Sequence, residues 1–194
     1  ALCCLPLRAH FLRVMPNRRD TVLGVVAGVG LALAGCSGRP NVANLDSADT
    51  AIICLGDSLT SGEGASPGHD YPSLLAKRLG HPVINAGLAG DTTSGALRRL
   101  EADVLSRHPR LVIVALGGND FLQQRPWQET FTNLETIVGR IQERGAMVVL
   151  IGVQPGLLGD AARGEFRKLA RKHRALFEPN ILEGLKVMLH SVRG

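Results

Sequence analysis

The chain has 194 residues, of which 45% are hydrophobic and 4% aromatic, which is enough for one domain with a sizeable core and a tail. Its 22 basic and 17 acidic side chains give a net charge of +5. Because four of the basic residues and one acidic residue precede residue 36, the remainder carries 18 basic and 16 acidic side chains, and such a balance gives no reason to expect a nucleic-acid partner.

The first 35 residues have the pattern of an export signal. Arg18-Arg19 is followed by an apolar run from Thr21 to Gly35, which is shorter than the ~20 residues that a membrane-spanning helix needs. The run ends in Leu33-Ala34-Gly35-Cys36, which resembles a bacterial lipobox. The resemblance implies cleavage before Cys36 and a lipid on its thiol, which would anchor the protein to a membrane of the bacterial envelope, on the periplasmic side. The alternative is a buried helix that ends in an inert cysteine.

Three segments are expected from the composition. Residues 1–35 form the N-terminal extension and signal segment, residues 36–49 a flexible tether rich in small and polar residues, and residues 50–194 the folded domain.

From Thr50 onward, apolar runs alternate with amphipathic segments, which predicts an α/β domain. The run over residues 111–116 is continuously apolar, as in a strand covered on both faces. The cluster Arg167, Lys168, Arg171, Lys172 and Arg174 is interpreted as a solvated helix face, and Cys54 as a small core residue. With right-handed crossovers, the pattern predicts a three-layer α/β/α sandwich with a parallel sheet. The expected strands cover residues 51–55, 82–85, 111–116, 147–153 and, more weakly, 176–177; the expected helices cover residues 71–79, 94–106, 128–143 and 161–175, with Gly145 ending the third.

Three polar segments each follow an apolar run, so they should gather at one edge of the sheet. They are Gly56-Asp57-Ser58-Leu59, Asn85-Ala86-Gly87-Leu88-Ala89-Gly90-Asp91 and Leu116-Gly117-Gly118-Asn119-Asp120. A serine hydroxyl becomes a good nucleophile when a base takes its proton and donors stabilise the resulting oxyanion. The Ser58 backbone at a helix start, the unobstructed N–H of Gly90 and the side-chain amide of Asn119 are candidate donors.

These three blocks, in this order, resemble the SGNH (GDSL) hydrolase family over about residues 50–183. Within the family the chain is most similar to small bacterial periplasmic enzymes with thioesterase, arylesterase and lysophospholipase activity. The resemblance implies a flavodoxin-like fold, Ser58 as nucleophile, and an oxyanion hole made by the Ser58 backbone, Gly90 and Asn119. It also implies a small acyl ester or thioester substrate, an acyl-enzyme on Ser58, and neither a metal nor an organic cofactor.

Structural roles compete with these assignments. Ser58 could be only a helix N-cap, and Asn119 could only satisfy backbone groups of its loop. Structural hydrogen bonding is the preferred interpretation for Asp57, Asp91 and Asp120, and a surface position for His69. A further set of side chains could line an acyl pocket or pack in the core: Tyr71, Phe121, Leu122 and Trp127.

The chain departs from the family in one respect. The family's last block, Asp-x-x-His, supplies the general base and the acid that orients it, and no such block occurs in these 194 residues. Neither His173 nor His190 has an aspartate three residues earlier. By spacing, the block and the final helix are expected at or beyond Gly194, so a catalytically inactive, truncated lipoprotein or pseudoenzyme is the alternative function. A flavodoxin-like module with residues 58–62 as a phosphate loop leaves Asn119 unexplained.

Overall fold

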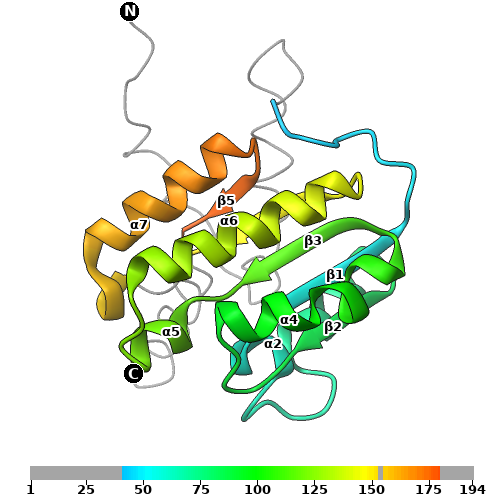
Figure 1. Ribbon diagram of the computed structural model, residues 1–194. Helices are drawn as coiled ribbons and strands as arrows, with labels where there is room; N and C mark the ends of the chain where they lie inside the picture. The colour runs from blue at the N-terminus through cyan, green and yellow to red at the C-terminus, as the bar shows by residue number, and fades with distance from the viewer. Residues whose placement is uncertain (1–40, 153–154, 180–194) are drawn as a thin grey trace, which may run out of the picture. The chain divides into compact units, whose positions relative to one another are not determined.

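A computed structural model describes residues 41–152 and 155–179 of the chain. In this range five parallel strands form one sheet in the order β2-β1-β3-β4-β5 (Figure 1). The predicted α/β architecture with a parallel sheet is confirmed. The strands are β1 (Ala51–Gly56), β2 (Val83–Gly87), β3 (Pro109–Ala115), β4 (Met147–Ile151) and β5 (Leu176–Glu178).

Helices cover both faces of this sheet. The crossover from β1 to β2 runs in the opposite direction along the sheet from all later crossovers. Because such connections are right-handed, α3 lies on one face, whereas α4, α6 and α7 lie together on the other, in front of the sheet in Figure 1. The helices are α2 (Ser58–Ser61), α3 (Tyr71–Leu79), α4 (Thr93–Asp103), the 3₁₀ turn η1 (Leu105–Arg107), α5 (Gly118–Leu122), α6 (Trp127–Glu143) and α7 (Pro155–Lys172).

Successive side chains of a strand point to opposite faces of the sheet, so each central strand contributes to two cores. Ile53 of β1 and Val112 of β3 point toward α4, α6 and α7 and are fully buried there. Cys54 and Ile113, one position further along each strand, are buried on the other face with Tyr71 of α3 nearby. A strand buried on both faces has no polar positions, which explains the continuous apolar runs of the sequence.

Two helices differ from their predicted bounds by more than one residue, and the strand predicted over residues 147–153 ends at Ile151. The helix expected over residues 94–106 ends at Asp103, because Val104 leaves helical geometry with φ of −126° and ψ of −61°, and the chain continues as η1. The last helix begins at Pro155 rather than at residue 161, since the fixed φ of proline suits the first helical turn, and it ends at Lys172 rather than at residue 175. Gly145, with φ of +79°, follows the end of α6 as predicted.

Residues 41–49, which we assigned to the tether, make specific contacts with the domain. The Ala43 N–H donates to the carbonyl of Arg174 at 3.0 Å. The Asn44 amide donates to the carbonyls of Gln142 and Ala146 at 2.8 and 2.9 Å. The ordered contacts of the domain therefore reach back to Ala43. Cys36 and residues 180–194 lie outside the described range.

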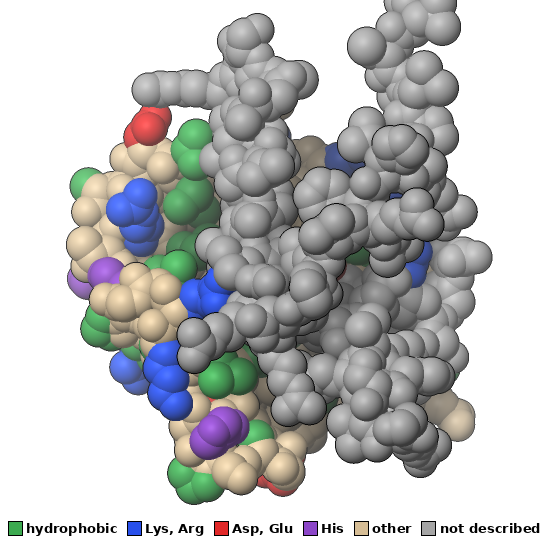
Figure 2. Space-filling model, turned by 180° about the vertical axis from the view of Figure 1, so that it is seen from behind, with side chains coloured by type: hydrophobic (Ala, Val, Ile, Leu, Met, Phe, Trp, Pro, Cys, Tyr) green, Lys and Arg blue, Asp and Glu red, His purple; other side chains and the backbone are tan. Residues whose placement is uncertain are grey.

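The basic cluster on α7 lies on the surface, as its helical spacing predicts. Arg167, Lys168, Arg171 and Lys172 are exposed, and the two lysines pair with Glu165 and Glu135. On the opposite face, which Figure 2 shows, basic side chains stand in several separate places among hydrophobic and uncharged ones. Within residues 41–152 and 155–179, no helix has both the length and the apolarity needed to cross a bilayer.

Candidate functional site

The three polar segments lie side by side at the carboxyl edge of the sheet. They follow β2, β1 and β3, which are neighbours in that order. Between β1 and β3 the direction of chain progression reverses, and such a switch point opens a crevice where α/β proteins bind ligands. The topology therefore brings the loops of Ser58, Gly90 and Asn119 together.

Ser58 is the first residue of α2, directly after β1. The helix N-cap is Asp57, whose carboxylate accepts from the Leu59 N–H at 3.1 Å. The interpretation of Ser58 as the N-cap is therefore wrong: the preceding carboxylate does the capping. At the first helical position the Ser58 N–H has no acceptor within its own helix, and the residue is half-buried.

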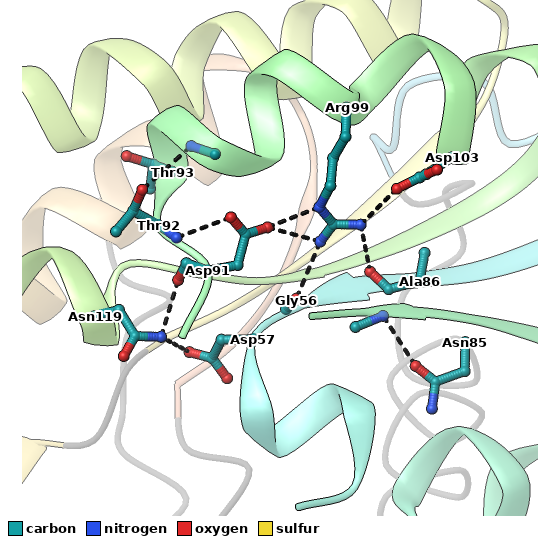
Figure 3. A network of polar contacts seen from close by, with 12 residues as sticks. Gly56, Asp57, Asn85, Ala86, Asp91, Thr92, Thr93, Arg99, Asp103 and Asn119 are labelled. Carbon is teal, nitrogen blue, oxygen red and sulfur yellow. Dashed lines mark hydrogen bonds and ion pairs between the residues drawn. The ribbon is translucent and has the colours of Figure 1, made fainter. Parts of the chain in front are cut away.

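Asn119 ties the three loops together (Figure 3). Its Nδ2 lies 2.9 Å from the carbonyl oxygen of Asp91 and 3.5 Å from Oδ2 of Asp57. A side-chain amide carries two N–H groups. One of them donates to the backbone carbonyl of Asp91, as expected if Asn119 satisfies backbone groups of its surroundings. The other has only the long contact with the Asp57 carboxylate. That second N–H is therefore the one available to a ligand.

Gly90 occupies a tight turn between these partners. Its φ is +74°, a backbone conformation that disfavours side chains, and the turn is closed by the Asp91 N–H bonded to the Leu88 carbonyl at 3.1 Å. A Cβ at Gly90 would meet nothing within 4 Å. The glycine is therefore required by its conformation rather than by crowding, and the space beside it is open to a ligand.

Asp57 is a buried carboxyl with 8% of its surface exposed. Burial raises its pKa above the ordinary value, and the nearby charges of Asp91 and Asp120 raise it further, against the hydrogen bond from Leu59. Its contacts with α2 and Asn119 confirm the structural hydrogen-bonding role that the sequence favours.

Asp91 is held by Arg99, a residue that sequence reasoning missed. The guanidinium donates to Asp91 Oδ2 at 2.8 Å, to the carbonyls of Ala86 and Gly56 at 2.9 and 3.2 Å, and to Asp103 at 2.9 Å (Figure 3). Only the Asp103 contact follows from helical spacing. The loop-stabilising role predicted for Asp91 is confirmed.

Asp120 of α5 has a loop-stabilising role, as Asp91 does. Only 1% of its surface is exposed, and it accepts from the Thr93 N–H at 2.9 Å and from the Thr93 hydroxyl at 2.5 Å. Thr93 opens α4, so this pair fixes the third loop to the helix that follows the second.

The described histidines are mostly remote from Ser58. His81, His108 and His173 precede β2, β3 and β5, so they lie at the amino edge of the sheet. His69, in the loop before α3, is exposed, with Nδ1 3.2 Å from the Pro67 carbonyl, as predicted for a surface histidine. In the described ranges, no three His, Cys, Asp or Glu residues group as a metal site would require.

Apolar side chains border the three loops. Leu59, Leu88 and Leu122 expose 53%, 52% and 66% of their surface, and each lies within three residues of Ser58, Gly90 or Asn119. Tyr71 instead packs in the core of the α3 face. Phe121 stacks on Trp127, and both are partly exposed. Core packing, one of the two interpretations left open, is therefore confirmed for Tyr71. It is wrong for the exposed side chains of Phe121, Leu122 and Trp127, for which an acyl pocket stays a prediction.

Residues 54–179 match the GDSL-like lipase/acylhydrolase family. The chain is 31% identical to the esterase TesA of Pseudomonas aeruginosa over 165 residues, which cover 80% of this chain and 82% of the relative. It is 34% identical to thioesterase 1/protease 1/lysophospholipase L1 of Escherichia coli over 143 residues, which cover 70% and 68%. Among solved structures it is similar to AlinE4, an SGNH-hydrolase family esterase, with a TM-score of 0.61, 36% identity, and coverage of 71% and 79%.

Proposed function

The chain belongs to the GDSL-like lipase/acylhydrolase family, and from that premise we propose that it hydrolyses carboxylic esters or thioesters through an acyl-enzyme on Ser58. The relatives are named as an esterase, an arylesterase and a thioesterase/lysophospholipase. The substrate class proposed here is a small acyl ester or thioester.

In the proposed reaction, the Ser58 hydroxyl attacks the carbonyl carbon and the alcohol or thiol leaves. Water then attacks the acylated serine and releases the acid. The tetrahedral oxyanion of each step accepts from the backbone N–H groups of Ser58 and Gly90 and from the Asn119 amide.

The observation that carries the proposal is that the three proposed donors come from loops that meet at one edge of the sheet. Ser58, Gly90 and Asn119 come from loops after three adjacent strands, and Asn119 is bonded to both neighbouring loops. Donors fixed before the reaction cost no reorganisation when charge develops.

The exposed leucines favour an apolar acyl or aryl group as part of the substrate. Leu59, Leu88 and Leu122 flank the three donors and are at least half exposed. Apolar surface at a site is stabilised when a ligand covers it.

A second candidate is an acyl-binding protein of the same fold that does not turn over. Among the described histidines, His81, His108 and His173 lie at the amino edge of the sheet and His69 is exposed, so none of them is assigned as the base that would accept the Ser58 proton.

Hydrolysis of p-nitrophenyl acetate, butyrate and octanoate and of an acyl-CoA separates the two candidates. We expect turnover by the wild type and by Ser61→Ala, a control on the same helix, and a loss of roughly 10³-fold or more in Ser58→Ala. Turnover that persists in folded Ser58→Ala would overturn the role of Ser58. Saturable binding of the acyl group without turnover by the wild type would establish the second candidate.

We further propose that residues 1–35 are an export signal, that residues from Cys36 onward lead to the domain, and that Cys36 carries a lipid at the envelope membrane. Support comes from Leu33-Ala34-Gly35-Cys36 after the apolar run. Growth with an alkyne-bearing fatty acid tests it: the wild type should acquire the label, and Cys36→Ser should not. Equal labelling of both would exclude attachment at Cys36.

A further inference from the structure

We propose that Arg99 is a positioning residue, which holds the two backbone donors of Ser58 and Gly90 in register with each other. Its effect on reactivity rests on the proposed function, whereas its effect on the position of the loops does not.

Arg99 contacts the strand ends that lead into the two donor loops, and the residue that follows Gly90. Nη2 donates to the carbonyl of Gly56, two residues before Ser58, at 3.2 Å. Nη1 donates to the carbonyl of Ala86 near the end of β2 at 2.9 Å. Nε donates to the carboxylate of Asp91, the neighbour of Gly90, at 2.8 Å. One side chain therefore joins the carboxyl ends of β1 and β2 to the Gly90 turn.

The second half of the connection runs through Asp91. Its Oδ1 accepts from the Thr92 N–H at 3.0 Å, and its backbone oxygen accepts from Asn119 at 2.9 Å. Figure 3 shows Asp91 between Arg99 on one side and Asn119 on the other. Of the three proposed oxyanion donors, Asn119 belongs to this network. Gly90 is adjacent to Asp91, and Ser58 is two residues after Gly56.

Burial makes the arrangement stiff. The side chains of Arg99 and Asp91 expose only 17% and 4% of their surface, so their attraction is weakly screened. A guanidinium presents five N–H groups in a rigid planar fork, whereas a lysine ammonium presents three on a flexible stem. Lysine can keep the charge beside Asp91 but cannot reproduce the planar fork that joins it to both strand carbonyls.

A substitution at Gly95 disturbs the same network through Asp91 instead of Arg99. A Cβ at Gly95 would lie 2.0 Å from Asp91 Oδ1 and 3.2 Å from its Cγ. Gly95→Ala must therefore move the Asp91 carboxylate while leaving Arg99 and all three donors unchanged in sequence.

Each variant has a matched control. For Arg99→Lys it is Arg98→Lys, on the exposed side of α4. For Gly95→Ala it is Gly139→Ala inside α6, where the atom nearest to the added Cβ is His173 Cε1 at 4.0 Å.

Amide hydrogen exchange tests the positioning role whether or not Ser58 is reactive. The Leu88 N–H bonds to the Gly56 carbonyl and the Asp91 N–H to the Leu88 carbonyl. In Arg99→Lys and Gly95→Ala we expect these two amides to exchange at least tenfold faster, with Val114 in β3 unchanged. Unchanged exchange at Leu88 and Asp91, or an equal rise at Val114, would overturn the inference.

The rate of phosphonylation of Ser58 by a fluorophosphonate tests the consequence for reactivity. We expect it to fall at least tenfold in Arg99→Lys and Gly95→Ala, and to stay at the wild-type value in both controls, with the unfolding midpoint measured for each protein. If the Leu88 and Asp91 amides exchange faster but the phosphonylation rate is unchanged, Arg99 stabilises the loops without affecting the reactivity of Ser58. A wild type that is never phosphonylated would count against the proposed function instead, and hydrogen exchange would still decide the positioning role.

Discussion

Gly87→Ala tests whether the position of α2 sets the reactivity of Ser58. Gly87 ends β2 directly beneath that helix, and a Cβ there would lie 2.2 Å from the Ser61 nitrogen and 2.6 Å from the Thr60 carbonyl carbon. Ordinary contact begins at 3.4 Å. Because both atoms are backbone, relief requires α2 to retreat from β2 by about 1.2 Å, the difference between these distances.

Such a shift has two calculable effects. Overpacking of this kind typically costs about 1–3 kcal/mol, which leaves a domain of ordinary stability folded. A misplacement of about 1 Å at a reacting group can lower the rate about 10²-fold. We therefore expect a modest fall in the free energy of unfolding in urea and a much larger fall in the rate of Ser58 phosphonylation.

Gly139→Ala is the control for the added methyl group. It lies within α6, where the nearest atom to the new Cβ is 4.0 Å away, so stability should rise by about 0.5–1 kcal/mol with the labelling rate unchanged. If folded Gly87→Ala protein is labelled at the wild-type rate, the packing of α2 against β2 does not set the reactivity of Ser58.

Three further predictions concern buried groups. Thr93→Val removes the hydroxyl bonded to Asp120 and should lower the free energy of unfolding by about 1–3 kcal/mol; unchanged urea denaturation would contradict it. Because burial raises the pKa of Asp57 from 3.8, the folded state holds that proton more tightly than the unfolded state. The stability of the wild type should therefore fall relative to Asp57→Asn as the pH rises from 3.8 through the raised value, and a difference independent of pH would exclude this. Burial also raises the pKa of Cys54 to about 12, so iodoacetamide at pH 8 should modify it only after unfolding, as peptide mapping would show.

Sequence reasoning succeeded where the signal is local and repeated. The central strands β1 and β3 are buried on both faces over most of their length, so residues such as Ile53, Cys54 and Val112 stand in continuous apolar runs. The loops that follow adjacent parallel strands must meet, and therefore the meeting of the Ser58, Gly90 and Asn119 loops was predictable from the order of the elements.

The extents of the short helices could not be found in the same way, although the helix start at Ser58 was expected and is confirmed. α2 and α5 span four and five residues, too few for a 3.6-residue period to appear. The capping carboxylate of Asp57 was visible in the sequence, but its neighbour Ser58 is an equally good cap by residue type. Only the coordinates decide between them.

Arg99 could not be identified from the sequence because its main acceptors are distant. Gly56 and Ala86 lie 43 and 13 residues away and contribute only backbone carbonyls, which any residue type supplies. On an amphipathic helix, an arginine four residues before Asp103 predicts a surface ion pair. The contact with Asp103 exists, yet the same guanidinium also joins two strand ends.

Whether Ser58 is an activated nucleophile can be measured by reaction of the intact protein with a fluorophosphonate, followed by mass measurement and peptide mapping. We expect one added phosphonyl group per chain, located on Ser58, absent from Ser58→Ala and retained in Ser61→Ala. A wild-type protein that stays unmodified under conditions that label a related esterase, or that carries the group on another residue, would contradict it.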